Sequence, residues 1–302
     1  MKTNKINKKK PAIGFIGQGY IGKNYSDDFE NRGFDVVRYS LDKEYKNNKE
    51  KIKKCDIVFI AVPAQTIPDG FDDSIIKNAL KLVGKNKTVV IKSTIPVGKT
   101  EELQNKNKKI YLFHSPEFLT EATASYDASH PDRNIIGMPI WNKIYKKKAD
   151  EIMSILPKSP YNLICNSRDA ELIKYGGNCM SYTKVIFVNI FYDLVTNSGA
   201  NWETVKEAIS ADPRIGKHHI EPIHKSGRGA GGHCFIKDFA MLSKMYDEFV
   251  GNKYGKNVLK SLEEKNKHLL TKTRKDLDLL YGVYGKNKKS IRQTQSKRKS
   301  KK

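Results

Sequence analysis

The sequence predicts an α/β protein in which a Rossmann-type, doubly wound parallel sheet is followed by a long central helix and an all-helical domain. Three observations lead to this prediction. A glycine-rich turn follows a short apolar segment near the start of the 302-residue chain, apolar segments of strand length then alternate with helical patterns, and one long helical pattern covers residues 169–197. We therefore expect a dinucleotide-binding domain at residues 11–166 and a helical domain at residues 167–285.

The glycine-rich turn has the spacing of a dinucleotide-binding loop. It follows apolar residues 12–16, and a helical pattern and a second strand pattern at 34–39 come after it. In such a loop Gly17 permits the tight turn, Gly19 lets backbone approach a pyrophosphate, and Gly22 lets the helix pack on the strand. The alternative is a glycine turn in an ordinary βαβ unit. The residues expected to contact a cofactor here are Gly17, Gly19, Tyr20, Ile21 and Gly22.

The end of the second predicted strand departs from the usual NAD pattern. NAD-binding units place Asp or Glu there to hold the ribose hydroxyls, whereas this chain has Ser40, with Arg38 before it and Asp42 after it. Ser40 lacks the charge that would repel a 2′-phosphate, and Arg38 could accept one. NADP therefore stays open beside NAD, while Asp42 could still reach the ribose.

Further apolar segments predict the rest of the sheet. They lie at residues 56–62, 88–91, 109–113 and 134–137, and a helical pattern follows at 143–156. Ligands gather at the C-terminal ends of parallel strands. The polar segments after these strands are therefore candidate site residues: Val62 and Pro63, Ser93 and Thr94, and residues 115–121.

The helical half carries the candidate chemistry. Lys174 and Asn178 are four residues apart in the long helix and share a face, and Gly176 and Gly177 between them indicate a close approach of backbone or substrate. Cys234 follows a glycine-rich loop, where backbone N–H groups and nearby Lys or His would favour a thiolate nucleophile, with Asp238 one turn on. The alternatives are a solvated lysine and an inert buried cysteine.

Composition limits the other classes of function. The net charge of +23 comes mostly from Lys/Arg-rich residues 1–10 and 286–302, which have no acidic residue and are expected to be disordered; any binding of nucleic acid or anionic lipid is expected only there. The sequence has no apolar stretch of the roughly 20 residues that a membrane span needs, and no signal peptide pattern. Four cysteines without paired spacing favour neither a disulfide framework nor a zinc site, and His233 has no matching second ligand, so we expect a cytoplasmic protein without metal.

In this order, the motifs resemble those of the nucleotide-sugar 6-dehydrogenases, and most closely the UDP-glucose 6-dehydrogenases, over residues 12 to about 245. The residues that carry the resemblance are Gly17–Gly22, Val62–Pro63, Ser93–Gly98, Ser115–Glu121, His130–Arg133, Glu171–Lys174 with Asn178, Asp212–Gly216 and Gly231–Asp238.

The resemblance implies oxidation of the C6 alcohol of UDP-glucose to UDP-glucuronate in two hydride transfers to NAD. Cys234 matches the cysteine that forms a thiohemiacetal and then a thioester, and Lys174 and Asn178 match residues that stabilise the oxyanions. Asp238 and Glu121 match carboxylates used in proton transfer and hydrolysis. Thr94 matches a residue that places water, and the cofactor is expected to contact Ser40, Asp42, Val62, Pro63, Thr94 and Glu121. Other matches to substrate-site residues are Glu117, Phe118, Leu119, Arg214, Gly231 and Lys237.

The resemblance also implies a homodimer through the central helix, because Arg214 matches an arginine that reaches the substrate of the partner subunit. The family usually continues into a third domain that binds the nucleotide half of the substrate, and no such domain is recognised here. Three explanations stay open: a separate UDP-binding chain supplies it, the basic tail holds the diphosphate, or the substrate is smaller. The alternatives are a dehydrogenase for GDP-mannose or a UDP-N-acetylhexosamine, a two-electron β-hydroxyacid dehydrogenase without need of Cys234, and a non-catalytic relic or binding protein.

Overall fold

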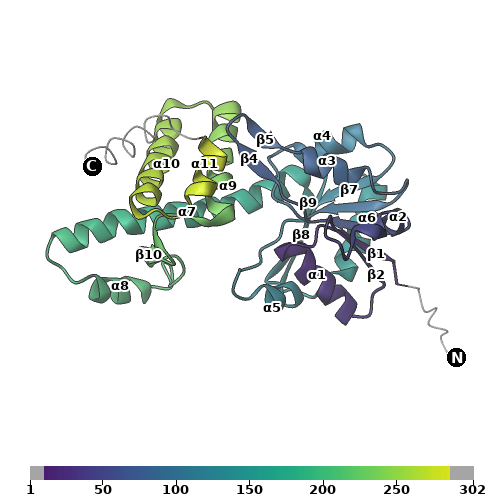
Figure 1. Ribbon diagram of the computed structural model, residues 1–302, viewed down its shortest axis with the longest axis horizontal. Helices are drawn as coiled ribbons and strands as arrows, with labels where there is room; N and C mark the ends of the chain where they lie inside the picture. Colours follow the sequence, from purple (N-terminus) through teal and green to yellow (C-terminus); the bar gives the residue numbers. More distant parts are fainter. Residues whose placement is uncertain (1–9, 286–302) are drawn as a thin grey trace, which may run out of the picture. The chain divides into compact units, whose positions relative to one another are not determined.

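The computed structural model describes residues 10–285, which fall into two compact units (Figure 1). The first unit contains the chain up to Ala64 and the segment Asp73–Lys174; the second contains Gln65–Asp72 and the chain from Tyr175 on. Helix α7 (Ser167–Asn197) begins in the first unit and continues into the second. The disorder and the binding roles expected for the basic tails concern residues that, apart from Lys10, lie outside the described range.

A seven-stranded sheet forms the first unit, in the order β2-β1-β3-β6-β7-β8-β9. The first five of these strands are parallel, whereas β8 runs antiparallel to β7 and parallel to β9. Because β1 has β2 on one side and β3 on the other, the strand order reverses at β1, where ligands bind in open α/β sheets. The strands are β1 (Ile13–Ile16), β2 (Val36–Tyr39), β3 (Ile57–Ile60), β6 (Thr88–Ile91), β7 (Tyr111–His114), β8 (Arg133–Met138) and β9 (Tyr161–Asn166).

The core of this unit explains the apolar segments of the sequence. Strands β1, β3 and β6 are buried along their whole length, as expected for parallel strands with both faces covered. Phe15 of β1 stacks on Phe59 of β3 with ring centroids 4.9 Å apart, and Phe29 packs against both.

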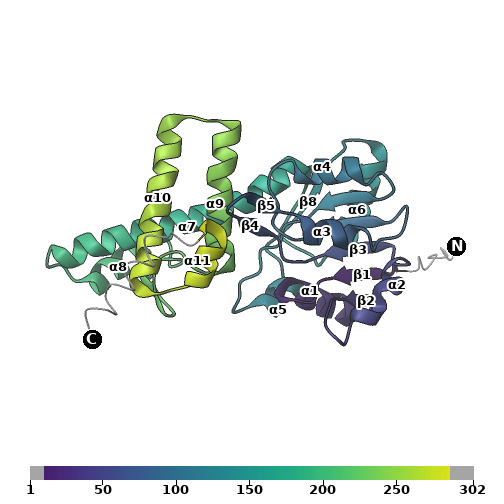
Figure 2. The same ribbon diagram turned by 45° about the horizontal axis from the view of Figure 1, so that its top comes forward.

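Helical segments of the first unit connect and cover these strands, and α1 packs beside α5 (Figures 1 and 2). They are α1 (Tyr20–Asn31), η1 (Lys46–Asn48), α2 (Lys49–Ile52), α3 (Ser74–Leu80), α4 (Lys99–Lys106), α5 (Ala124–Ser129) and α6 (Lys143–Ile155).

The second unit is helical, as predicted. After α7 come α8 (Trp202–Ser210), the short strands β10 (Ile223–His224) and β11 (Gly227–Arg228), α9 (Gly232–Phe249), α10 (Lys253–Thr273) and α11 (Leu277–Tyr284). Helices α9 and α10 lie side by side in a hairpin (Figure 2). Tyr182 of α7 stacks on Phe239 of α9 with centroids 3.9 Å apart, which joins the two helices within the core of this unit.

Two features of the second unit differ from the sequence prediction. The sequence also predicts one helical pattern at about 256–281. The structure has two helices there, because Arg274 and Asp276 have positive φ angles of 59° and 50° and turn the chain between α10 and α11. In addition, the hairpin of β4 (Gln65–Ile67) and β5 (Gly70–Asp72) packs on α9 and α11 although it comes from the first half of the sequence. No helix within residues 10–285 is both long and apolar enough to span a membrane.

Candidate active site

The glycine turn after β1 has the geometry that a dinucleotide needs. A Cβ at Gly17, whose φ is +93°, would overlap the carbonyl of Ala61, and one at Gly22 would overlap the carbonyl of Gly17. A Cβ at Gly19 would meet nothing within 4 Å, so the backbone just before α1 is open on that side. No acidic residue lies in the first turn of α1, which Tyr20 begins. The open backbone and the helix N-terminus together suit a pyrophosphate.

The end of β2 supplies a carboxylate from an unusual position. Ser40 Oγ donates to Asp42 Oδ2 at 2.7 Å, and the Asp42 N–H donates to Ser40 Oγ at 3.2 Å. The Gly17 N–H donates to the Tyr39 carbonyl at 2.8 Å, which joins the glycine turn to the end of β2. Asp42 is therefore held near the turn, two residues after the position that usually carries the acid.

Arg38 is not available to bind a 2′-phosphate, which is the possibility that the sequence left open. Its guanidinium forms ion pairs with Asp27 at 2.7 Å and with Glu30 at 2.6 Å, and both acids lie on α1. These carboxylates also raise the pKa of Arg38, against the opposing effect of burial. A guanidinium already paired with two carboxylates has little remaining attraction for a 2′-phosphate.

The segments after β3 and β6 meet at the same edge of the sheet. Ser93 Oγ donates to the Val62 carbonyl at 2.6 Å, so the two segments are bonded to one another. Thr94 is buried next to Ser93, whereas Pro63 is exposed. These residues are at the C-terminal ends of adjacent strands, where the sequence predicted a ligand site.

Lys174 and Glu117 form a buried ion pair within the first unit. Lys174 Nζ lies 3.0 Å from Glu117 Oε1 and donates to the Glu117 carbonyl at 2.7 Å. Glu117 Oε2 in turn accepts from the Leu119 N–H at 2.8 Å, and the Phe118 ring lies 5.5 Å from Lys174 Nζ. Glu121, which the sequence grouped with these residues, is exposed.

A carboxylate that the motif contains fixes the start of α7. Glu171 is fully buried and accepts from the N–H groups of Gly98 at 2.6 Å and Thr100 at 2.8 Å. It thereby caps the N-terminus of α4 from another helix, and burial raises its pKa to about 7. Because Glu171 anchors the N-terminal part of α7, Lys174 is presented one turn later in a fixed orientation.

Within the second unit, α7 and α9 bring an amide and a carboxylate together. Asn178 Nδ2 donates to Asp238 Oδ2 at 2.6 Å, and Lys237 Nζ lies 2.5 Å from Asp238 Oδ1. Cys234 stands one turn before Asp238, in the first turn of α9, and is the one exposed cysteine of the four, all of which are thiols. The N–H groups of a first helical turn lack intrahelical partners and stabilise a thiolate.

The glycine loop that leads to Cys234 is held by residues that sequence reasoning missed. Asn266 of α10 pairs with both the N–H (2.8 Å) and the carbonyl (2.9 Å) of Ala230, and Asp276 accepts from the Gly232 N–H at 2.7 Å. A Cβ at Gly231 would overlap the Asp276 carboxylate. Gly231 therefore has a packing role, and no local sequence signal marks Asn266 or Asp276 as its supports.

Other predicted residues are less constrained. Arg214 is exposed and bonded to Asp212 of its own loop at 2.6 Å. Gly176 and Gly177 do not mark a close approach of the backbone, since a Cβ at either would meet nothing within 4 Å. The space beside these glycines is therefore open next to Asn178.

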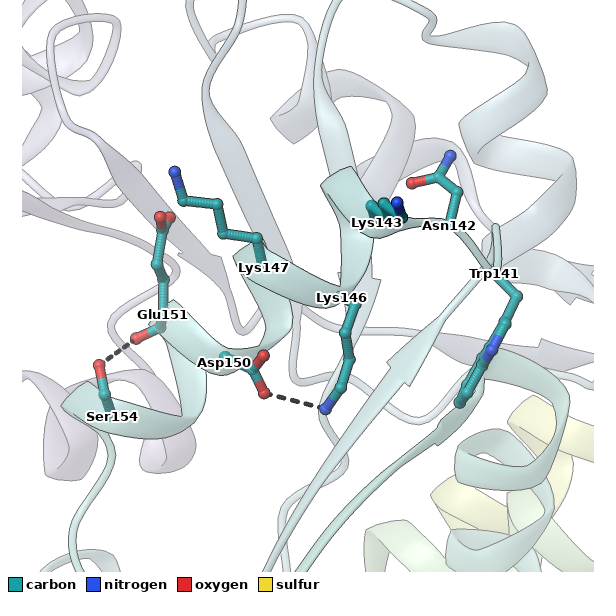
Figure 3. A pocket seen from close by; sticks show the side chains of 8 residues that line it. All are labelled: Trp141, Asn142, Lys143, Lys146, Lys147, Asp150, Glu151 and Ser154. Atoms are coloured by element: carbon teal, nitrogen blue, oxygen red, sulfur yellow. Dashed lines mark hydrogen bonds and ion pairs between the residues drawn. The ribbon is translucent and has the colours of Figure 1, made fainter.

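A hollow beside α6 contains none of the predicted site residues (Figure 3). Lys146 and Asp150 form an ion pair of 2.9 Å along it, and Ser154 donates to the Glu151 carbonyl at 2.7 Å. The side chains that line it are Trp141, Asn142, Lys143, Lys146, Lys147, Asp150, Glu151 and Ser154. Across residues 10–285, no group of three or more His, Cys, Asp or Glu side chains could hold a metal ion.

Two models of a single family match the chain. The model of the NAD-binding domain of the UDP-glucose/GDP-mannose dehydrogenase family matches residues 40–153, and that of the central domain matches residues 168–268. Together they cover more than half of the chain. The chain therefore belongs to the UDP-glucose/GDP-mannose dehydrogenase family and contains its NAD-binding domain.

Individual curated relatives point to the same family, and a solved structure shares the fold. A putative UDP-glucose 6-dehydrogenase of Bacillus subtilis is 31% identical over 212 residues, which cover 64% of this chain and 47% of the relative. A UDP-glucose 6-dehydrogenase of Rickettsia typhi is 27% identical over 281 residues, covering 88% and 59%. The solved structure of a UDP-glucose dehydrogenase from Pyrobaculum islandicum matches with a TM-score of 0.74 at 24% identity, covering 87% of this chain and 69% of that one. The chain spans about half the length of the curated relatives it matches.

Proposed function

We propose that this chain oxidises the C6 alcohol of a nucleotide sugar, UDP-glucose in the first place, to the carboxylate with NAD as oxidant. The observation that carries the proposal is the exposed Cys234 in the first turn of α9, one turn before an Asp238 carboxylate that is bonded to Asn178. An exposed thiol in the first turn of a helix is suited to attack a carbonyl carbon, because the unpaired N–H groups there favour its thiolate.

The chain's own residues supply the covalent steps. Two NAD molecules, bound one after the other, would each accept one hydride, and the proton of the C6 hydroxyl would pass to a base of the chain. After the first oxidation, the Cys234 thiolate forms a bond to the aldehyde carbon, and the aldehyde oxygen becomes the alkoxide of a thiohemiacetal. Lys174 and Asn178 donate hydrogen bonds to this oxygen. The second oxidation leaves a thioester at Cys234; water attacks its carbonyl, the C–S bond breaks, and the sugar carboxylate and the thiol are released.

Asp238 and Glu121 are proposed to exchange protons in these steps, with Thr94 orienting the water. Glu117, Phe118, Leu119, Arg214, Gly231 and Lys237 are proposed to contact the substrate. In this scheme the glycine turn holds the cofactor's pyrophosphate at Gly19, and Val62 and Pro63 line the cofactor beyond it.

The test is turnover of the purified chain with a panel of UDP- and GDP-sugars, followed by absorbance of the reduced cofactor. Two equivalents of reduced NAD per sugar and a carboxylate product support the proposal. A small β-hydroxyacid is added to the panel. One equivalent of reduced cofactor per molecule of this acid, with no turnover of the sugars, would instead support the two-electron β-hydroxyacid dehydrogenase, which uses lysine and asparagine on the central helix without the thiol. Turnover of GDP-mannose or a UDP-N-acetylhexosamine in place of UDP-glucose would redefine the sugar.

The cofactor proposed is NAD rather than NADP, because Asp42 presents a carboxylate and Arg38 is already paired. We expect Asp42→Asn to weaken NAD binding about tenfold and to leave NADP binding within about twofold, because a charge-assisted hydrogen bond to the ribose is lost. Calorimetric titration with each cofactor measures the ratio. Glu50→Gln, which removes an exposed carboxylate on α2, is the control; an unchanged ratio in D42N would contradict the assignment.

A homodimer through α7 is proposed from an apolar stripe on that helix. Met180, Phe187, Ile190 and Leu194 are 76%, 61%, 46% and 63% exposed, at successive spacings of seven, three and four residues, which place them along one face. A second copy could bury the same stripe of its own helix against this one. We expect Phe187→Glu with Leu194→Glu to give a monomer by light scattering, whereas Val258→Glu on α10 leaves the dimer intact. A wild-type monomer would exclude the proposed interface.

A further inference from the structure

Lys92 is a buried lysine to which neither the motifs nor the proposed mechanism gives a role. It is the first residue after β6 and only 4% exposed. Its Nζ lies 4.4 Å from the centroid of the Tyr25 ring and donates to Ser115 Oγ at 3.3 Å and to the Pro116 carbonyl at 3.5 Å. In the described part of the chain, no carboxylate forms an ion pair with it. A buried ammonium with only long, neutral acceptors is costly to the fold.

The contacts of Lys92 are with the turn that holds Lys174. Pro116 gives its carbonyl to Lys92, and the next residue, Glu117, gives its carbonyl and its carboxylate to Lys174 at 2.7 and 3.0 Å. Two lysines, one from the end of β6 and one from α7, thus hold consecutive peptide groups of a single turn. We propose that Lys92 is a positioning residue that orients Glu117 and, through it, the Lys174 ammonium. This inference rests on the proposed function.

The protonation state of Lys92 changes near neutral pH, whereas those of its neighbours His114 and Tyr25 do not. The groups that face it are Tyr25 of α1, His114 of β7, Glu117 of the turn and Lys174 of α7. Burial lowers the pKa of Lys92 to about 7, against the opposing effect of Glu117. Burial and the charge of Lys92 lower the pKa of His114 to about 3, and burial raises that of Tyr25, so both are neutral at pH 7. Lys92 therefore loses its charge near pH 7, whereas His114 and Tyr25 do not titrate there.

Removing the charge of Lys92 is therefore expected to raise the stability of the fold and to lower the activity. An unfolded lysine keeps its proton up to a pKa near 10.4, whereas folded Lys92 releases it near 7, so the unfolded chain binds more protons between these values. Stability therefore rises with pH through this window, and the charged form below pH 7 carries the full penalty. If Lys92 only supported the fold, its removal would lower the melting temperature.

The experiment compares Lys92→Met with Lys148→Met. Lys148 makes the same kinds of contact elsewhere in the unit, with its Nζ 3.2 Å from Thr88 Oγ1 and 4.4 Å from the Tyr111 centroid. At pH 6, K92M is expected to lower kcat on the order of tenfold with KM within about twofold, because Lys174 loses its fixed orientation. The difference should narrow above pH 8, where wild-type Lys92 is neutral and keeps only neutral hydrogen bonds to Ser115 and Pro116. K92M should also melt about 3 °C higher at pH 6, and K148M should retain the wild-type kcat.

The outcomes separate the two proposals. An active wild type together with a K92M variant that has the same kcat at every pH overturns the positioning role alone. A parallel loss of kcat at all pH values with a lower melting temperature also overturns it, since that pattern marks a structural lysine. A folded wild-type chain that turns over no nucleotide sugar overturns the proposed function and this inference with it.

Discussion

Replacing Cys234 with alanine is expected to stop formation of the sugar acid and to lower its rate by at least about 10³-fold. The thiol is the one group in the proposed scheme that forms a covalent bond to the substrate. Without it, the aldehyde has no route to a thioester. Cys234 is exposed in the first turn of α9 and is not part of the core of its unit. The loss of acid formation is therefore expected without a change in folding.

Product analysis makes this prediction specific. Carboxylate and aldehyde are quantified together with reduced NAD after incubation with UDP-glucose, and the circular dichroism of the variant is compared with that of the wild type. Cys55→Ala is the control, because it removes a buried thiol just before β3, at the opposite end of that strand from the proposed site. Normal acid formation by C234A would show that the thiol is dispensable. A wild type and a C234A variant that both release one reduced NAD per substrate and no acid would instead favour a two-electron reaction.

The local part of the site could be predicted from the sequence. The glycine turn, the strand ends and the position of Cys234 before Asp238 are all patterns within a few residues, where spacing decides geometry. The structure adds what those patterns do not contain. The bond between Asn178 and Asp238 joins residues 60 positions apart, and the caps from Glu171 on Gly98 and Thr100 span 73 and 71 positions.

The same limit explains the misjudged elements. Residues 274–276 contain neither Gly nor Pro, so the pattern continues as a helix, and the turn depends on Asp276 bonding to Gly232 across the unit. Arg38 looks available in the sequence because its partners Asp27 and Glu30 come from α1, which is brought to it only when α1 packs beside β2. In each case a polar side chain is satisfied by a distant partner that the pattern does not specify.

Two substitutions in the glycine turn should separate folding from cofactor binding. Gly19→Ala is expected to leave the melting temperature unchanged, because its backbone is extended (φ −72°, ψ −167°) and its Cβ would meet nothing within 4 Å. It should nevertheless weaken NAD binding at least about tenfold, or roughly 1.4 kcal/mol, because the methyl group occupies the space proposed for the pyrophosphate.

Gly22→Ala is expected to act in the opposite way. Its Cβ would overlap the Gly17 carbonyl, so α1 must move away from β1, at a cost of about 3 kcal/mol or more of folding free energy. Thermal unfolding and calorimetric titration of both variants against wild type give the comparison. If G19A binds NAD as tightly as the wild type, the pyrophosphate does not lie against this turn. If G22A has the same melting temperature as the wild type, the overlap is relieved without moving the helix. The two glycines are therefore equivalent in the motif but differ in what they meet: Gly22 faces the chain itself, and Gly19 faces open space.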